Sequence, residues 1–247
     1  MSLEKSRKDS NKIIEGIDKT GDKVKRSSKK LYNKAIDKVI DQNIKNPPFT
    51  ANSLVAKSID NDLRKILDST EESYDKFIKA QQRYLSSNYS IDLSKTDLNI
   101  LVSKKSDLID ELVTNTTILK EDIKAILFAN LGRGVPQARL ARLLKDLYPA
   151  YARNANTIVN TGIGKTYIDT NVAKFQQSNL KWYLYAGPDD KVTRDIPCKH
   201  WVNRAFPASQ LNIVSSTRLS LFNCRHNIIA ITEDEAKDLP KLDTSFA

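Results

Sequence analysis

Two cysteine–histidine pairs with the same spacing are the residues of this chain best suited to chemistry. The 247 residues include two cysteines and two histidines, and all four lie within a single short window. Cys198 and His200 occur in DIPCKHW, and Cys224 and His226 occur in FNCRHN. Residues i and i+2 of an extended strand point to the same face, so each pair would converge. Thiolates and imidazoles are the ligands of structural zinc sites, and the pattern therefore predicts a zinc site with two cysteine and two histidine ligands.

The same four residues allow three other interpretations. Each cysteine could be a small buried apolar residue and each histidine a hydrogen-bonded polar one, repeated by coincidence. The cysteines could pair on oxidation, but MSLEKSRKDS lacks the apolar region of a secretory signal, and we expect a cytoplasmic protein whose thiols stay reduced. A thiolate activated by histidine could be a nucleophile, although no acidic orienting residue or oxyanion element accompanies it. We therefore interpret the quartet as structural, with or without metal, and place catalysis last.

The elements that would carry these pairs begin near residue 180, where the sequence changes character. LKWYLYAG (180–187) alternates between two faces, one with Trp182 and one with Tyr185. GPDD then turns the chain, and NIIAI (227–231) is typical of another short strand. We expect a small strand-containing module after residue 180.

The sequence before residue 180 predicts helices. Apolar residues recur at spacings of three and four over 9–46, where NPPF would end the helix, and again over 53–86. Ser94, followed by Asp97, has the pattern of a helix N-cap. The first helix has a narrow apolar stripe that needs a partner, either in this chain or in another subunit. Shorter helices are expected over 95–103, 105–117, 119–131 and 136–147, and a longer one over 151–178.

These patterns predict an α+β fold, with a mostly α-helical N-terminal body and a small mixed α/β C-terminal module. The predicted domains are a basic amphipathic helix or arm at 1–46, a helical domain at 47–179, and a module with the Cys/His cluster at 180–247. A hydrophobic content of 40% allows a packed core, and seven glycines with a mean hydropathy of −0.48 favour a polar, helix-rich chain. No apolar run reaches the roughly 18 residues of a membrane-spanning helix, so we expect none.

The net charge of +10 is unevenly distributed. Residues 1–46 carry thirteen Lys or Arg against seven Asp or Glu, so more than half of the excess lies there. Such a balance favours a polyanion or an acidic protein surface as partner. Because lysines and aspartates are interspersed, a solvated helix kept soluble by its lysines explains the charge almost as well. The candidate contact residues are Lys23, Lys25, Arg26, Lys29, Lys30, Arg139 and Arg142.

An acidic pair near the C-terminus suggests a second candidate enzyme activity. Glu233-x-Glu235, downstream of SSTR (215–218), is faintly similar to elements of ADP-ribosyltransferases. Acidic residues are also favoured at helix N-termini, where they meet the positive end of the helix dipole. We therefore expect a protein that is not an enzyme.

Six short motifs follow one another between residues 125 and 231. They are GRGVPQARLARLL, IVNTGIGKTY, LKWYLYAGPDD, DKVTR from Asp190 to Arg194, PCKHW and FNCRHNI. Their order and spacing resemble the Mu protein F-like head morphogenesis family, the minor head proteins of tailed bacteriophages. The chain departs from this family by having Cys-x-His where some members have Cys-x-x-Cys. It also has SLF where many members have a second cysteine or His-Pro.

This resemblance implies a structural minor capsid protein, made in the host cytoplasm and built into the virion in several copies. It implies a place in the head interior or at the portal vertex, and a role in head morphogenesis and in DNA packaging or ejection. The implied partners are the portal protein, the major capsid protein and packaged double-stranded DNA, bound without sequence specificity. The alternatives are an ADP-ribosyltransferase-like or Cys/His enzyme and a non-viral basic nucleic-acid-binding protein.

Four more residues are assigned structural roles in this interpretation. We expect Asp190 and Arg194 to hold a turn by charge pairing. Trp182 and Arg225 belong to the motifs around the cluster, and Arg225 would help the Cys/His quartet to fix the C-terminal module.

Overall fold

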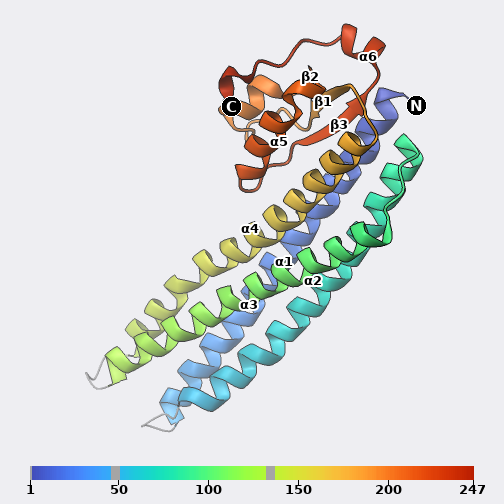
Figure 1. Cartoon of the computed structure of the whole chain (residues 1–247). Coiled ribbons are helices and arrows are strands. Elements are labelled where there is room, and N and C mark those ends of the chain that lie inside the picture. Colours follow the sequence, from blue (N-terminus) through green and yellow to red (C-terminus); the bar gives the residue numbers. More distant parts are fainter. Residues whose placement is uncertain (1, 46–50, 132–136) are drawn as a thin grey trace. The chain divides into compact units, whose positions relative to one another are not determined.

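The computed structural model describes residues 2–45, 51–131 and 137–247 (Figure 1). Long helices fill most of the chain before residue 178, and a small sheet with short helices follows, which confirms the predicted α+β class. The predicted helix end at NPPF lies outside the described residues. The long helices are α1 (Leu3–Lys45), α2 (Ala51–Tyr89), α3 (Lys95–Leu131) and α4 (Gln137–Gln177).

The C-terminal module, residues 180–247, is built on a three-stranded antiparallel sheet with the order β2-β1-β3. The two predicted strands are present as β1 and β3, whereas β2 is too short for its alternation to be recognised. Tyr185 of the central strand lies opposite Arg204 on one side and Ile228 on the other. The elements are β1 (Trp182–Ala186), η1 (Asp195–Lys199), β2 (Arg204–Pro207), η2 (Ala208–Gln210), α5 (Leu211–Ser220), β3 (Asn227–Ile231), α6 (Glu233–Lys237) and η3 (Thr244–Phe246).

Two of the long helices are more continuous than the sequence predicted. The three short helices expected over 95–131 are one helix, α3. Thr116 and Thr117 do not interrupt it, because their hydroxyls donate to the carbonyls of the residues four positions earlier. Helix α4 likewise runs through Pro149, which lies on its exposed face. Solvent there can satisfy the backbone carbonyl that a proline leaves without an N–H partner.

The described chain forms two compact units, each assembled from separate segments. The helical unit comprises Lys19–Tyr74 and Lys105–Val159, and the sheet unit comprises Met1–Asp18, Asp75–Lys104 and Asn160–Ala247. The two units divide the chain at other residues than the domain boundaries predicted after residues 46 and 179. The three-domain division stays a prediction.

The apolar stripe of α1 is buried within the chain itself. Its buried positions recur at spacings of three and four, the periodicity of helices that pack side by side. In the sheet unit, the hydroxyl of Ser6 lies within hydrogen-bond distance of those of Tyr84 and Tyr89 on α2. Among the α1 side chains that the structure describes, the buried ones are Ser6, Ser10, Ile13, Ile14, Ile17, Gly21, Val24, Ser28, Leu31 and Tyr32.

A few polar contacts join β3 of the sheet to the helices α1 and α2 of the same unit. The hydroxyl of Tyr89 donates to the carbonyl of Ala230 in β3, with an O···O distance of 3.2 Å. The side-chain amide of Asn227 donates to the hydroxyl of Ser10 on α1. These contacts anchor β3, which begins at Asn227, directly after the second cysteine–histidine pair.

The helical unit combines buried apolar positions with polar contacts between neighbouring helices. Lys120 of α3 pairs with Asp60 of α2, and Tyr151 of α4 donates to Asp122 of α3. Burial and the neighbouring Asp122 carboxylate together raise the pKa of Tyr151 to about 12.

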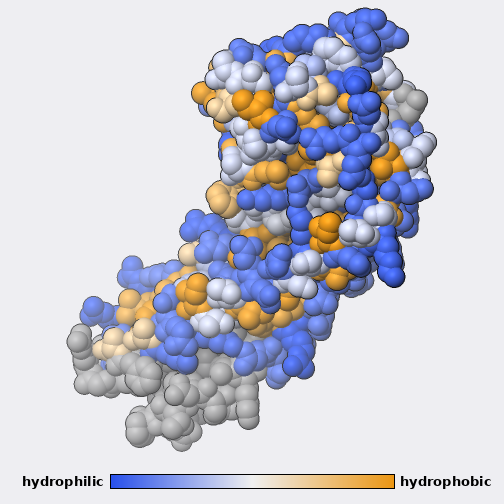
Figure 2. Space-filling model, in the orientation of Figure 1, coloured by the Kyte–Doolittle hydropathy of each residue, from blue (hydrophilic) through white to orange (hydrophobic). Residues whose placement is uncertain are grey.

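The face drawn in Figure 2 is largely hydrophilic, with hydrophobic residues scattered between the polar ones. Within the ranges that the structure describes, every helix is too polar or too short to cross a bilayer.

Candidate metal centre and basic groove

Three of the four predicted ligands form one buried cluster in the C-terminal module. The Sγ atoms of Cys198 and Cys224 are 3.9 Å apart, and the Sγ of Cys224 is 3.6 Å from Nδ1 of His226. The three donor atoms all lie within 4.8 Å of one another, and all three residues are buried. This cluster could hold a metal ion such as zinc.

The local backbone explains why Cys224 and His226 converge as predicted. They lie in the segment that leads directly into β3, and their donor atoms converge as those of residues two apart on a strand do. The His226 ring stacks on Tyr185 of β1, with ring centroids 5.2 Å apart. Its Nε2 atom is 2.9 Å from the carbonyl of Pro188. Because a carbonyl only accepts, Nε2 carries the hydrogen, which leaves the lone pair of Nδ1 facing Cys224.

His200, the fourth predicted ligand, is not part of the cluster. Its side chain is exposed and its ring stacks on Phe246 of η3, with centroids 4.1 Å apart. The prediction assumed that residues 198–200 are extended, but Cys198 begins a helical turn in which the N–H of Val202 bonds to its carbonyl. Residues two apart on a helix point in nearly opposite directions, because each residue advances the helix by about 100°. The predicted set of four ligands is therefore corrected to three.

Arg218 of α5 is a buried part of the site that the sequence did not reveal. Its Nε donates to the carbonyl of His226 and one terminal nitrogen donates to that of Cys224, both at 2.7 Å. Only 1% of the residue is exposed. The guanidinium thus ties together the backbone of two ligand residues. Its only sequence signal was its place in SSTR, which suggested a different activity.

The hydroxyl of Tyr185 lies 3.7 Å from the sulfur of Cys198 and 3.8 Å from that of Cys224. Strand alternation placed Tyr185 on one face of β1 but gave no sign that this face meets the cysteines. The hydrogen bond from the Cys198 thiol lowers the pKa of Cys224, and the positive charge of Arg218 acts in the same direction. That hydrogen bond raises the pKa of Cys198.

The predicted turn at DKVTR is held by a different charge pair from the one expected. Asp190 accepts two hydrogen bonds from Arg225, at 2.7 and 3.0 Å, whereas Arg194 donates to the carbonyl of Phe222. Within the turn, Asp190 also accepts from the Thr193 hydroxyl and the N–H of Val192. The hydrogen bonds from Arg225 hold the pKa of Asp190 well below its usual range. The motif residues thus join the two loops on either side of the cluster.

Trp182, the remaining motif residue, begins β1 at the edge of the module. The ammonium of Lys241 lies 4.9 Å from the centroid of its ring, which is a cation–π contact. This residue therefore connects the central strand to the C-terminal segment.

The acidic pair is engaged in backbone structure. Glu235 forms a capping box with Thr232 at the start of α6. One carboxylate oxygen accepts from the backbone N–H of Thr232, and the other accepts from that of Leu3 at the start of α1. Both oxygens therefore have structural partners.

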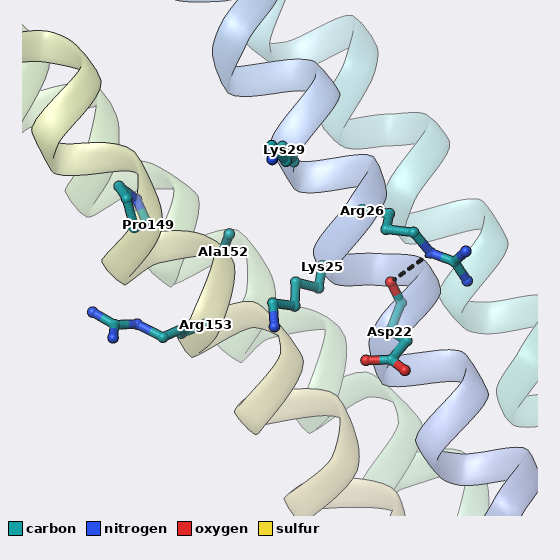
Figure 3. Close-up of a pocket in the computed structure, with 7 residues that line it drawn as sticks. All are labelled: Asp22, Lys25, Arg26, Lys29, Pro149, Ala152 and Arg153. Carbon is teal, nitrogen blue, oxygen red and sulfur yellow. Dashed lines mark hydrogen bonds between the residues drawn. The ribbon is translucent and has the colours of Figure 1, made fainter.

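A basic groove in the helical unit contains three of the predicted contact residues. It has a volume of about 700 Å³ and lies between α1 and α4 (Figure 3). Lys25 extends from α1 toward α4, and the Nε of Arg26 donates to the backbone carbonyl of Asp22. The sequence did not predict Arg153, which adds a charge from α4. The lining residues are Asp22, Lys25, Arg26, Lys29, Pro149, Ala152 and Arg153.

The other predicted contact residues are exposed but do not line this groove. They are Lys23 and Lys30 on α1, and Arg139 and Arg142 on α4. Lys25 and Arg153 could be brought together only by the packing of α1 beside α4.

The chain was compared with models of protein families, with curated proteins and with solved structures. None of the three comparisons found a match.

Proposed function

We propose that this chain is a structural minor head protein of a tailed bacteriophage. It docks on the portal or the inner capsid during head assembly and contacts packaged DNA without reading its sequence. The proposal starts from the motif order that resembles the Mu protein F-like family. The contact with DNA, called the DNA clause, is independent of docking during assembly and is tested separately.

The observation that carries this proposal is that residues of several motifs meet and do structural work. Asp190 of DKVTR binds Arg225 of FNCRHNI, and Cys198 of PCKHW lies against Cys224. Each contact joins segments about 26 to 35 residues apart in the sequence. Motifs whose residues hold a module together are what a structural component needs, because its function is to present a fixed surface.

The use of the acidic pair favours this proposal over an ADP-ribosyltransferase. A catalytic glutamate must face its substrate, but both oxygens of Glu235 accept hydrogen bonds from backbone N–H groups. The Cys/His enzyme alternative is less favoured because the cysteine sulfurs are buried.

The basic groove supports the DNA clause. Lys25, Lys29 and Arg153 carry their charges on exposed side chains around a hollow that contains a single acidic residue, Asp22. Contacts of lysine and arginine with phosphates release counterions and carry no sequence information. The groove is therefore suited to the DNA backbone and not to particular bases.

Assembly is tested by expressing the portal, scaffold and major capsid proteins of the virus that encodes this chain, with and without it. We expect the chain to co-sediment with assembled heads or with isolated portal. Particles that form normally and never contain the chain would overturn the proposal. If the chain instead binds DNA tightly but no viral component, the non-viral nucleic-acid-binding alternative is favoured.

The DNA clause is tested by fluorescence anisotropy with duplexes of unrelated sequence at several salt concentrations. Replacing Lys25, Arg26, Lys29 and Arg153 with Gln should reduce the slope of log K against log salt by about 0.9 for each lost phosphate contact. A charge-matched control replaces four exposed basic residues of the sheet unit with Gln, namely Lys79, Arg83, Lys95 and Lys181. Equal loss in both variants would remove the groove from the proposal, and no binding at low salt would remove the DNA clause.

A further inference from the structure

We infer that Cys198, Cys224 and His226 bind one zinc ion, and that this ion holds the C-terminal module together. The inference rests on the geometry of the three side chains and of their neighbours. It does not depend on the viral role, because a structural metal would serve the module in any function.

Two of the three spacings between the donor atoms match a tetrahedral zinc site. With Zn–S bonds of about 2.3 Å and a Zn–N bond of about 2.0–2.1 Å, a tetrahedron places two sulfurs about 3.8 Å apart and a sulfur and a nitrogen about 3.6 Å apart. The corresponding distances are 3.9 Å between the sulfurs of Cys198 and Cys224, and 3.6 Å between Cys224 and Nδ1 of His226. The third pair, the sulfur of Cys198 and Nδ1 of His226, lies within 4.8 Å, so this distance must shorten by at most about 1.2 Å when an ion binds.

The surrounding residues have the arrangement that metal sites require. A histidine ligand commonly donates its other ring N–H to a backbone carbonyl, which fixes its tautomer and orientation. His226 does this with Pro188. Arg218 holds the carbonyls of both Cys224 and His226, so the backbone beneath two ligands is fixed as well.

The chemistry of the donors selects the metal. Two thiolates and an imidazole favour zinc over magnesium or calcium, which prefer oxygen ligands. Three protein ligands leave one tetrahedral position, and the Tyr185 hydroxyl is the oxygen that lies close to both sulfurs. That hydroxyl is placed to donate to the thiolates and to close this side of the site.

Two metal-free states compete with this inference. The thiols could remain as a hydrogen-bonded pair, or they could be oxidised to a disulfide by dissolved oxygen, with two thiols losing two protons and two electrons. A zinc site contains one equivalent of metal and two thiolates that react only after the ion is released. A hydrogen-bonded pair contains no metal, and a disulfide contains no titratable thiol.

Metal analysis of the full-length chain tests the inference, after purification under reducing conditions from medium containing zinc. We expect one zinc per chain, released by a thiol-blocking mercurial and detected by a colorimetric chelator. Replacement of zinc by cobalt should give the absorption bands of tetrahedral, thiolate-bound cobalt. Substoichiometric zinc together with absence of these bands would overturn the inference.

The chain offers a matched control for the ligand variants. Cys224→Ser and His226→Gln should each weaken zinc binding by more than about 100-fold, because even outer-shell changes cost 10–100-fold. His200→Gln changes the same residue type a short distance away, and it should leave the zinc affinity unchanged because His200 is exposed and stacked on Phe246. Loss of zinc in the His200 variant would contradict the three-ligand assignment.

A measurement on the unmodified chain avoids variants that fail to fold. Both tryptophans, Trp182 and Trp201, lie in the C-terminal module, so their fluorescence reports on that module alone. A strong zinc chelator should lower the denaturant midpoint followed by fluorescence and change the midpoint followed by circular dichroism of the helices much less. An unchanged fluorescence midpoint after complete metal removal would show that the ion does not hold the module together. Failure of capsid association would leave all of these results unaffected.

Discussion

The four long helices and the C-terminal module are stabilised in different ways. Along each helix, buried positions repeat at spacings of three and four, and many of them are interchangeable apolar side chains. The C-terminal module is instead stabilised by individual residues, each of which makes a different kind of contact. Arg218 binds two carbonyls, His226 lies between Tyr185 and Pro188, and Gly187 leaves the space that the His226 ring occupies.

This difference affects what each region can tolerate. A periodic apolar interface accepts substitutions that preserve volume, because it needs hydrophobic residues of about the right size. A cluster of specific polar contacts does not, because a changed group leaves a buried partner unsatisfied. Conservative substitutions are therefore the sharpest way to compare the two regions.

The largest effect is expected for Arg218→Lys, which keeps the charge but loses the fork that reaches two carbonyls. A lysine can satisfy one of the two buried carbonyls in this geometry, so we expect a loss of roughly 2–4 kcal/mol in the free energy of unfolding. The measurement is urea unfolding followed by tryptophan fluorescence.

The matched conservative change in the helices is Leu119→Met, at a position on α3 that is 1% exposed. It should cost less than about 1.5 kcal/mol, since it nearly conserves volume. Equal costs for Leu119→Met and Arg218→Lys would remove the distinction drawn between the two regions.

An intermediate effect is expected for Gly187→Ala. A Cβ atom there would lie 2.6 Å from Cδ2 of His226 and 3.0 Å from its Cα, so the ring or the backbone must move. We expect a cost of about 1–3 kcal/mol, the usual range for overpacking, together with weaker zinc binding.

Gly16→Ala is the control for this change, because a Cβ on α1 at that position meets no atom within 4 Å. Alanine is favoured over glycine in a helix, so this variant should be more stable by about 0.5–1 kcal/mol. Destabilisation by Gly16→Ala, or no effect of Gly187→Ala, would show that space is not what distinguishes the two glycines.

The smallest effect concerns Asp97 at the start of α3. Its carboxylate accepts from the N–H of Ser94 at 2.7 Å and pairs with Lys174 of α4 at 2.5 Å. Burial by itself raises the pKa of Asp97, but the hydrogen bonds from Lys174 and Ser94 outweigh it and lower the pKa below 3.8. Asp97→Asn should therefore cost about 1 kcal/mol at neutral pH.

The pH dependence of this cost has a definite sign. A carboxylate whose pKa is lowered in the folded state stabilises that state above its unfolded pKa and loses this contribution as the pH falls through the folded value. The difference between the chain and its Asp97→Asn variant should thus be full at neutral pH and disappear in acid. Thermal unfolding followed by circular dichroism checks this, and a difference that grows in acid would contradict it.

The helical part of the fold could be predicted well because its information is local. Periodicity predicted α1 and α2, and the Ser94–Asp97 cap is present as expected. The breaks expected near residues 104 and 118 were wrong, because α3 is one continuous helix. Near residue 118, the hydroxyls of Thr116 and Thr117 bond to carbonyls within the helix, a choice of partner that the sequence does not show.

The candidate site could be predicted only in part. Cys224 and His226 converge as strand alternation predicts, whereas His200 diverges because Cys198 begins a helical turn. On a strand, residues two apart share a face, whereas on a helix they point in nearly opposite directions. A stretch as short as DIPCKH does not show which of the two it forms.

The sequence alone determined which regions are helical, that a strand-containing module follows residue 180, and that cysteine and histidine gather there. These are local properties, set by spacing along the chain. Only the tertiary structure decided that Arg218 and Tyr185 join the cluster, that Asp190 pairs with Arg225, and that Lys25 and Arg153 line one groove. Each of these contacts joins residues far apart in sequence, and their energy is available only once the packing of the elements has brought them together.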